Sequence, residues 1–337
     1  MKQKMDYGTG CPIIITLSIL RRRKKVDILL QFLLLVIGFV MLVKGADWFV
    51  DGAAGIAEKF GIPQLVIGLT IVAMGTSAPE AAVSITAALK KNADITIGNV
   101  VGSNILNVLV ILGVTSVIVA IAVADSTVKY EIPYMLFVSV LLLVFGITGN
   151  VISFIEGVAL WIAFIIYLTY LFIMAKKNKE EQPEDEKKRP IWLLILLVII
   201  GVVLIVKGSD IAVAAATKIA LAAHLSERFI GLTIVALGTS LPELVTSVTA
   251  AKKGKADIAI GNIVGSNIFN ILFVVGTTAL ITPVPFASNF IIDMSISIAA
   301  GVLLWACVFR KHKLTRAGGA AMLAGYVGYF IYLVVLR

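Results

Sequence analysis

The chain has 337 residues, of which 59% are hydrophobic and only 15% are charged, against about 25% charged residues in an average soluble domain. Its mean hydropathy of +1.02 and several apolar runs near the roughly 20 residues that cross a bilayer indicate a polytopic membrane protein and exclude soluble enzymes. The net charge of +9 does not favour a nucleic-acid partner, because most Lys and Arg lie in short loops beside apolar runs, where they set membrane orientation.

Residues 1–26 fit the rest of the chain poorly. They contain a short apolar patch, too small to span a bilayer, and end in the basic run from Arg21 to Lys25. One interpretation is a basic flank that orients the first helix. The other is a mis-assigned start, with translation beginning near Val26. No small-residue signal-peptide cleavage site is obvious.

Ten membrane-spanning helices are predicted after this leader, five on each side of a charged linker over 176–190. The linker has no apolar periodicity and marks the boundary between halves 27–175 and 191–337. The predicted spans cover residues 27–50, 63–89, 94–123, 131–148, 153–175, 191–213, 227–252, 257–282, 287–309 and 317–336.

The two halves repeat each other without a gap, which is the signature of an internal duplication. Each half holds five predicted spans, an odd number, so the second copy must be inverted in the membrane relative to the first. We therefore predict an all-α membrane protein of two inverted-topology five-helix repeats, a transporter design with the substrate at the midplane between repeats. Three motifs recur 163 positions later: GLTIVAMGTSAPE (68–80, then 231–243), GNVVGSNILN (98–107, then 261–270) and VKGAD (43–47, then 206–210).

The first of these motifs carries a carboxylate inside an apolar run. A charge at bilayer depth costs at least about 2.5–3.5 kcal/mol on insertion scales, so Glu80 is a functional candidate. Pro79 has no N–H and cannot bond the carbonyl of Gly75, and a carbonyl freed in hydrocarbon needs another partner. A cation would serve as that partner, so this motif predicts half of a cation site and its copy predicts the other half.

Further oxygens fall on the same helix face, because Ala73 and Ser77 precede Glu80 at helical spacing. Glu80 and Glu243 could instead pair with buried lysines, but no Lys lies in the middle of any predicted span. The serines could simply allow close helix packing, and the asparagines could hydrogen-bond between helices. The G-x-x-x-G pattern at 98–102 and 261–265 most simply indicates close helix contact.

Orientation follows from the loop charges. The linker side holds fifteen Lys and Arg against five on the other side, leaving out the leader. The linker is therefore predicted to be cytoplasmic and both ends of the ten-helix body to lie outside the cell membrane. The leader would add seven positive residues to the outer side, which conflicts with this orientation and favours the mis-assigned start.

Two G-T-S-x-P-E segments, each followed by G-N-x-V-G-S-N-I, resemble the α-repeats of the sodium/calcium exchanger family, within the cation/calcium exchanger superfamily. The resemblance covers about 27–337 and points to a prokaryotic member with two α-repeats. It implies Ca²⁺ bound between Glu80 and Glu243, with backbone carbonyls at Thr76 and Thr239. The further positions that it implies, for flanking Na⁺ sites and a central polar pair, are Ala73, Ser77, Ser103, Ala236, Ser240, Ser266, Asn107 and Asn270.

The chain departs from this pattern at one position. Several family members carry Asp where this chain has Asn270. With amides at both Asn107 and Asn270, the site offers a charge of about −2, so the number of driving ions and their identity stay open. Asn104 and Asn267 are interpreted as structural, on a different helix face. Asp47 and Asp210 are interpreted as capping or gating groups at the ends of the first and sixth helices.

The sequence therefore predicts a secondary antiporter that exchanges Na⁺ for Ca²⁺ by alternating access, with the first and sixth helices moving against the core. A proton-driven calcium or sodium antiporter is one alternative, a passive cation channel is another, and K⁺ dependence is open. No cofactor is predicted, and the partners are inorganic cations and the lipid bilayer, with no nucleic acid and no obligate protein partner. Cys11, Cys307, His224 and His312 stand apart and predict no disulfide or thiolate site. The absence of a nucleophile–base set or a phosphate loop predicts that the chain is not an enzyme.

Overall fold

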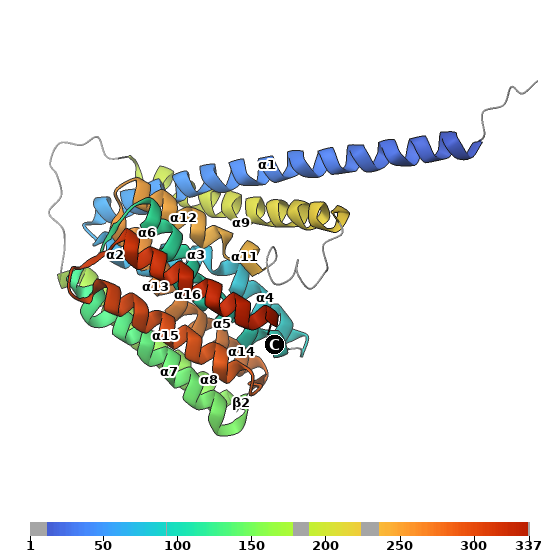
Figure 1. The fold of residues 1–337 in the computed structure, drawn as a ribbon. Coiled ribbons are helices and arrows are strands. Elements are labelled where there is room, and N and C mark those ends of the chain that lie inside the picture. The colour runs from blue at the N-terminus through green and yellow to red at the C-terminus, as the bar shows by residue number, and fades with distance from the viewer. Residues whose placement is uncertain (1–11, 92, 178–188, 224–235, 336–337) are drawn as a thin grey trace, which may run out of the picture.

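The structure is a computed structural model that describes residues 12–91, 93–177, 189–223 and 236–335. In these residues the chain is almost entirely helical, and the strands contain two residues each (Figure 1). The helices of the first half, with η for π-helical segments, are α1 Pro12–Phe60, α2 Gln64–Ile67, η1 Gly68–Val72, α3 Ala73–Thr76, α4 Ala78–Leu89, α5 Asp94–Leu106, η2 Asn107–Leu112, α6 Gly113–Ile118, η3 Thr127–Glu131, α7 Ile132–Gly149 and α8 Phe154–Lys177.

As far as it is described, the second half repeats this order, except that no separate π-helical segment precedes α15. Its helices are α9 Ile191–Ala222, α11 Ala236–Thr239, α12 Leu241–Lys252, α13 Ala256–Phe269, η5 Asn270–Val275, α14 Gly276–Ile281, α15 Phe290–Phe309 and α16 Arg316–Val335. The strands are β1 Ile121–Ala122, β2 Val151–Ile152, β3 Val284–Pro285 and β4 Lys313–Leu314. The all-helical class predicted from the sequence is confirmed.

Most of the predicted spans are continuous helices. Within the described ranges, eight helices are long and apolar enough to cross a membrane, and the bent pair Gln64–Thr76 and Ala78–Leu89 makes a ninth when taken as one span. Part of the predicted span 227–252 lies outside the described residues. Its described part, α11 and α12, is interrupted at Ser240 as α3 and α4 are at Ser77.

The first and sixth helices differ from their predicted bounds. The predicted start of the first span at residue 27 agrees with the apolar span Ile28–Phe60, but its predicted end at 50 is wrong. The helix itself, α1, runs from Pro12, within the predicted leader, to Phe60. The sixth helix, α9, likewise continues beyond 213 to Ala222. Nothing after Asp47 breaks α1 until Gly61, which has a φ of +63°, and Pro63. Single glycines inside a helix cost only about 1 kcal/mol each, so the helix continues through them.

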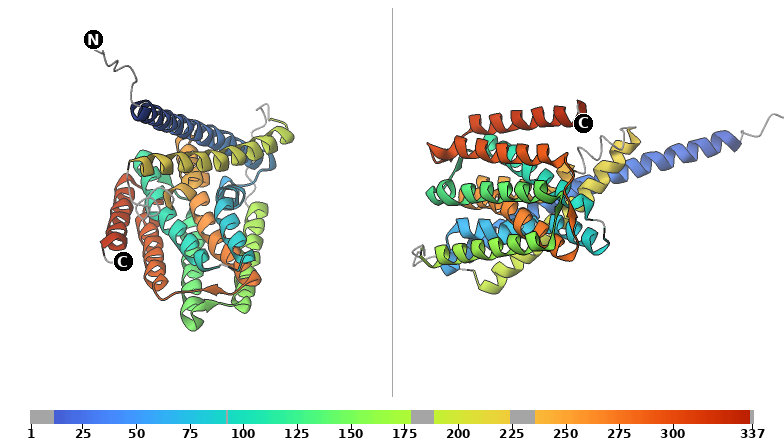
Figure 2. Two further views of the ribbon diagram at one scale, coloured as in Figure 1. Left: turned by 90° about the vertical axis from the view of Figure 1, so that its right-hand side faces the viewer. Right: turned by 90° about the horizontal axis from the view of Figure 1, so that it is seen from below.

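Both K-G-x-D motifs therefore lie inside helices rather than at helix ends, which corrects the capping interpretation of Asp47 and Asp210. In Figures 1 and 2, α1 and α9 lie side by side along one side of the bundle. Their backbones touch: a Cβ added at Gly45 would lie 2.9 Å from the carbonyl oxygen of Gly201, and one at Gly201 would lie 2.7 Å from the Phe49 nitrogen.

The two repeats face each other with reciprocal contacts. Gly38 meets Gly208 and Gly45 meets Gly201, so residue numbers rise along α1 as they fall along α9. Equivalent helices thus run in opposite directions, as the predicted inversion requires. The short strands agree, because β1 pairs with β4 and β3 pairs with β2, an arrangement that is unchanged when the repeats are exchanged.

Two glycines of α13 allow this helix to pack directly against η1 and α3 of the first repeat. A Cβ at Gly261 would lie 3.1 Å from the Gly68 Cα, and one at Gly265 would lie 2.7 Å from the carbonyl oxygen of Leu69 and 2.8 Å from the Ala73 Cβ. The close contact predicted from G-x-x-x-G is confirmed for this copy. It fixes the distance between α13 and the residues just before the break at Ser77.

Substituting Gly265 by alanine is expected to destabilise the protein by about 1–3 kcal/mol, because the new methyl group overpacks against backbone that has no room to move. The measurement is thermal unfolding of the purified variant in detergent. Gly328→Ala on α16 is the control, since no atom lies within 4 Å of the added Cβ there. Equal unfolding temperatures for the two variants would contradict the packing argument.

Candidate functional site

Glu80 and Glu243 are both buried, each with 1% of its surface exposed. Each lies in the first turn of a helix that follows a break, α4 for Glu80 and α12 for Glu243. At Ser77 the chain turns by 50° between the two helix segments, because Pro79 cannot continue the hydrogen-bond ladder across this point. The sequence therefore places a carboxylate directly behind a helix break in both repeats.

The two carboxylates come together between the repeats. Ser77, three residues before Glu80, donates its hydroxyl to Glu243 Oε1 at 2.9 Å. Ser103 of α5 donates to Glu80 Oε1 at 3.4 Å. Two of the predicted site residues, Ser77 and Ser103, therefore contact one or other glutamate directly, and the Ser77 hydroxyl links the first repeat to Glu243 of the second.

Five buried oxygens of this region have no hydrogen-bond partner among the described residues. They come from both repeats, and all belong to residues predicted to bind ions: Glu80 Oε2, Glu243 Oε2, Asn107 Oδ1, Asn270 Oδ1 and Ser240 Oγ. A buried oxygen that can accept but has no donor is costly, and bound cations would supply the missing partner. Oxygen ligands of this kind are those that Ca²⁺ prefers.

The side chains of this region offer two carboxylates, Glu80 and Glu243, and several uncharged oxygens. Within the described ranges, no group of three or more His, Cys, Asp or Glu gathers anywhere. A site that binds transition metals through nitrogen or sulfur is therefore not supported. Carboxylate and amide oxygens in a dry, helix-lined centre favour hard cations such as Na⁺ and Ca²⁺.

Four asparagines form a closed hydrogen-bonded set at the crossing of α5 and α13. Asn107 Nδ2 donates to Asn267 Oδ1 at 2.9 Å and Asn270 Nδ2 donates to Asn104 Oδ1 at 3.1 Å. Asn104 and Asn267 each donate to the other's backbone carbonyl at 3.2 Å. The amide NH₂ groups of Asn107 and Asn270 are thus held by neighbours, which leaves their Oδ1 atoms as the free acceptors.

The placement of Asn104 and Asn267 on a separate face is therefore wrong, although their structural role is supported. They bond directly to Asn107 and Asn270, because each side chain reaches across to the other repeat. Both helices change to π-helical geometry at this point, in η2 and η5, a change that recurs at functional sites and shifts the register that α-helical spacing predicts.

Asn99 and Asn262 were missed by the sequence analysis. Asn99 Nδ2 donates to the Glu80 backbone carbonyl at 3.1 Å and to Ser84 Oγ at 2.9 Å. Asn262 does the same for the Glu243 carbonyl at 3.4 Å and Ser247 Oγ at 2.9 Å. They tie each glutamate's turn to the neighbouring helix. The repeated motif could have identified them, since each is the first Asn of G-N-x-V-G-S-N.

The remaining predicted residues lie around the break. The carbonyl of Ala73 accepts from Ser266 Oγ at 3.3 Å and from the Ser77 N–H at 3.0 Å. Thr76 Oγ1 donates to Asn262 Oδ1 at 2.9 Å, so its side chain links the two repeats. Ala236 and Thr239 bound α11, directly before Ser240, and the surroundings of the Ala236 side chain lie outside the described residues.

Asp47 forms an ion pair with a lysine of the other repeat. Its carboxylate lies 3.4 Å from Lys253 Nζ, and the same amine lies 2.6 Å from Asp51. Lys253 follows the end of α12, so these pairs tie α1 to the helix that carries Glu243. Asp210 contacts only a residue of its own helix, Lys207 at 3.8 Å, as far as the described residues extend.

Comparison with known proteins gives concordant matches over most of the chain. The family model described as sodium/calcium exchanger protein matches residues 30–173 and 193–335. A putative antiporter, CaxA, from Alkalimonas amylolytica is 37% identical over 89% of this chain and 98% of its own length. The sodium/calcium exchanger MaX1 of Methanosarcina acetivorans is 36% identical over 91% of this chain and 99% of its own length.

A solved structure has the same fold. The sodium-calcium exchanger NCX_Mj, soaked with zero Na⁺ and Ca²⁺, matches with a TM-score of 0.78 and 34% identity, covering 92% of this chain and 100% of that one. This chain and the solved exchanger therefore share one fold over the matched residues.

Proposed function

The chain belongs to the sodium/calcium exchanger family, and we propose that it exchanges Na⁺ for Ca²⁺ across the cell membrane, with both ions bound between Glu80 and Glu243. The observation that carries this proposal is the set of five buried, unpartnered oxygens where the repeats meet. Membership of the family makes the chain a cation exchanger of the membrane and not an enzyme.

The binding chemistry follows from charge. Two carboxylates neutralise one Ca²⁺, and amide and hydroxyl oxygens complete the six to eight ligands that this ion takes. Thr76 and Thr239 would add backbone carbonyls beside each break. Na⁺ uses oxygens of the same kind, and Ser77, Ser103, Ser266, Ala73 and Ala236 would line its positions. Because both ions need the same two charges, they compete, and each drives the other off.

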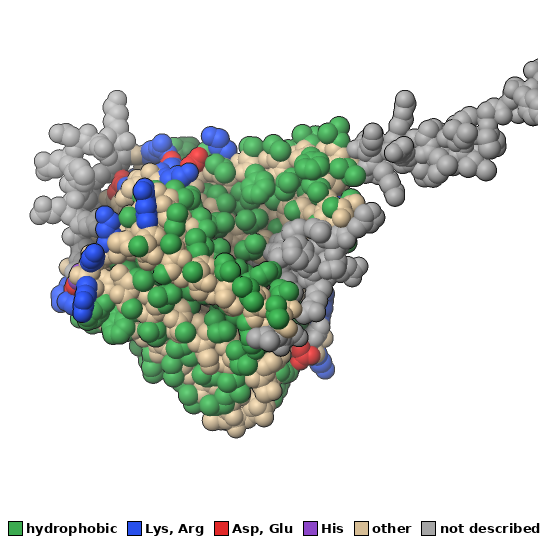
Figure 3. All heavy atoms as spheres, viewed as in Figure 1, with side chains coloured by type: hydrophobic (Ala, Val, Ile, Leu, Met, Phe, Trp, Pro, Cys, Tyr) green, Lys and Arg blue, Asp and Glu red, His purple; other side chains and the backbone are tan. Residues whose placement is uncertain are grey.

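The membrane arrangement is part of the proposal. The repeats would cover 27–175 and 191–337, with the charged linker 176–190 in the cytoplasm. Figure 3 supports one positive side: Lys and Arg gather mainly at one end of the visible face, while hydrophobic side chains cover most of the rest. This end is where α8 stops and α9 begins in Figure 1, and positive loops face the cytoplasm.

The test is ⁴⁵Ca²⁺ uptake into proteoliposomes containing the full chain, with the opposing gradient supplied in turn by Na⁺, H⁺ and K⁺. Uptake that requires internal Na⁺ and survives a proton uncoupler supports the proposal. Uptake that collapses with the uncoupler and ignores the Na⁺ gradient would identify a proton-driven antiporter instead. Flux without any counter-ion would identify a channel.

Alternating access requires α1 and α9 to move against the ion-binding helices. Ion pairs to two lysines that follow α12 hold α1 in place at one end of that helix. Lys253 pairs with Asp47 and Asp51, and Lys255 lies 2.7 Å from Glu58. The second repeat has no equivalent set, because the positions matching Asp51 and Glu58 are Ala214 and Leu221. We propose that these pairs favour the state in which α1 is closed against α12.

Replacing Lys253 by methionine is expected to loosen α1 on this side. Partly exposed pairs are worth about 0.2–1 kcal/mol each, so the population of the loosened state should rise a few-fold. Hydrogen exchange of residues 43–60, followed by mass spectrometry, measures this change. Lys90→Met is the matched control, because Lys90 occupies the equivalent repeat position and makes no ion pair among the described residues. An equal increase in hydrogen exchange in both variants would refute the proposal that these ion pairs hold α1 in place.

A further inference from the structure

A further buried carboxylate, that of Glu131, lies outside the ion site. Glu131, at the end of η3, has 1% of its surface exposed, and the equivalent position of the second repeat is Met294. Tyr170 of α8 donates its hydroxyl to Glu131 Oε1. The other oxygen, Oε2, has no partner among the described residues. A buried carboxylate oxygen without a hydrogen-bond donor or a ligand is costly.

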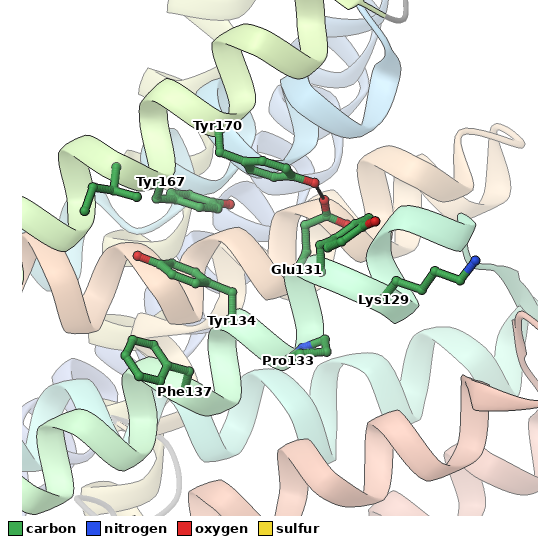
Figure 4. Close-up of a pocket in the computed structure, with 9 residues that line it drawn as sticks. Lys129, Glu131, Pro133, Tyr134, Phe137, Tyr167 and Tyr170 are labelled. Atoms are coloured by element: carbon green, nitrogen blue, oxygen red, sulfur yellow. Dashed lines mark hydrogen bonds between the residues drawn. The ribbon is translucent and has the colours of Figure 1, made fainter.

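A second unpartnered group lies beside it. The Tyr167 hydroxyl is buried and has no hydrogen-bond partner in the part of the chain that the structure describes. In Figure 4, Tyr167 and Tyr170 project from α8 toward the helix that carries Glu131 and Tyr134. The rings of Tyr134 and Tyr167 stack with centroids 5.5 Å apart. One carboxylate and several aromatic faces therefore border the same space.

That space is a pocket of about 470 Å³ between the start of α7 and the end of α8. Its volume falls within the range of about 300–1,000 Å³ typical of small-molecule sites. Its outer wall consists of Tyr130, Phe137 and Ile166, which are 57–60% exposed and belong to helical segments long and apolar enough to cross a membrane. The pocket therefore opens sideways toward lipid, and an occupant would enter from the bilayer.

Charged groups mark the edge of the pocket. Lys129 lines it and pairs with Asp125 at 2.7 Å, and in Figure 4 its side chain extends away from the tyrosines. Tyrosines and a lysine at the end of a span are typical of the membrane–water boundary. An occupant would thus have its polar part at the headgroup level and its apolar part against α7 and α8.

We propose that this pocket binds a phospholipid whose headgroup carries a primary ammonium group. The ammonium complements the Glu131 charge and supplies N–H donors for Oε2 and for the Tyr167 oxygen. Tyrosine faces attract cations as well. The lipid phosphate would lie within reach of Lys129 at the edge. A choline headgroup has no N–H, so it would leave both oxygens without a donor.

Native mass spectrometry of the full chain tests this proposal. The protein is released from nanodiscs containing equal amounts of phosphatidylethanolamine, phosphatidylcholine and phosphatidylglycerol, and the lipids that remain bound are counted. We expect one phosphatidylethanolamine to be retained at least about tenfold over phosphatidylcholine. Glu131→Gln should abolish this preference, and Tyr167→Phe should reduce it several-fold while the carboxylate stays in place.

The control is Tyr332→Phe on α16, which removes a tyrosine hydroxyl outside the pocket and should leave the retained lipid unchanged. Tyr167→Phe keeps the test valid even when Glu131→Gln fails to fold. Equal retention of the two zwitterionic lipids by the native chain would overturn the proposal. So would unchanged preference in both pocket variants, or a preference for phosphatidylglycerol, since that would show that Lys129 rather than Glu131 selects the lipid.

Discussion

Proteoliposomes carrying Glu243→Gln are expected to take up no more ⁴⁵Ca²⁺ than liposomes without protein. Glutamine keeps the size of the side chain and can still accept the hydroxyl of Ser77, which lies 2.9 Å from Glu243 Oε1. What it loses is one of two charges. A unit pair 4 Å apart is worth about 4 kcal/mol at an effective dielectric constant of 20, and Ca²⁺ carries two charges. Each 1.4 kcal/mol is tenfold in affinity, so Ca²⁺ affinity should fall at least about a thousandfold.

Glu80→Gln should have the same effect, because both carboxylates serve one ion. The matched control is Glu156→Gln, the same chemical change at a carboxylate that accepts the Ser153 N–H at 2.6 Å at the start of α8, away from the ion site. It should retain uptake. Size-exclusion profiles establish that the variants fold. Normal uptake by either ion-site variant would refute the assignment of the glutamates.

The glutamates could be predicted from sequence because their signal is local. A carboxylate one residue after a proline, inside an apolar run, is anomalous by itself, and its return 163 positions later removes the possibility of chance. Helix breaks at Ser77 and Ser240 follow from Pro79 and Pro242 by backbone chemistry alone. The break in each repeat can therefore be predicted without knowledge of any tertiary contact.

The asparagine set could not be predicted in the same way. Its hydrogen bonds join Asn104 and Asn107 to residues of the other repeat, and spacing within one helix carries no information about partners across a two-fold axis. The π-helical segments that begin at Asn107 and Asn270 also shift side chains from their α-helical positions. Asn99 and Asn262 were overlooked for a simpler reason, since an Asn beside a glycine is as easily explained by packing.

The length of the first helix could not be predicted from its apolar pattern either. An apolar run indicates where a helix can cross lipid, but a helix can continue past acidic residues, as α1 does from Asp47 to Phe60. There the charges of Asp51 and Glu58 are matched by Lys253 and Lys255 of the other repeat. These partners are 197–202 positions away in the chain, so the sequence predicts an end at residue 50, just before Asp51.

The dependence of the Ca²⁺ gradient on membrane potential is expected to report the charge of the ion site. A site with two carboxylates and two amides carries a charge of about −2, so one Ca²⁺ or two Na⁺ leave it neutral, whereas three Na⁺ would leave it at about +1 in a low-dielectric interior, which is strongly disfavoured. We therefore expect exchange of two Na⁺ for each Ca²⁺, with no net charge moved. The steady-state Ca²⁺ gradient in Na⁺-loaded proteoliposomes should then be unaffected by a potential set with K⁺ and valinomycin.

Asn270→Asp should make the same gradient respond to potential. The added carboxylate brings the site to about −3 and favours a third Na⁺, so that one net charge crosses per cycle. Moving one charge through 100 mV is worth about 2.3 kcal/mol, which corresponds to about fiftyfold in the steady-state Ca²⁺ ratio. Asn270 donates to Asn104 Oδ1 at 3.1 Å, so the Asn104 amide must rotate to face the new carboxylate, and thermal unfolding shows whether the variant tolerates this. A fiftyfold response in the native chain would mean that a charge moves without a third carboxylate, and the two-charge account of the site would fail.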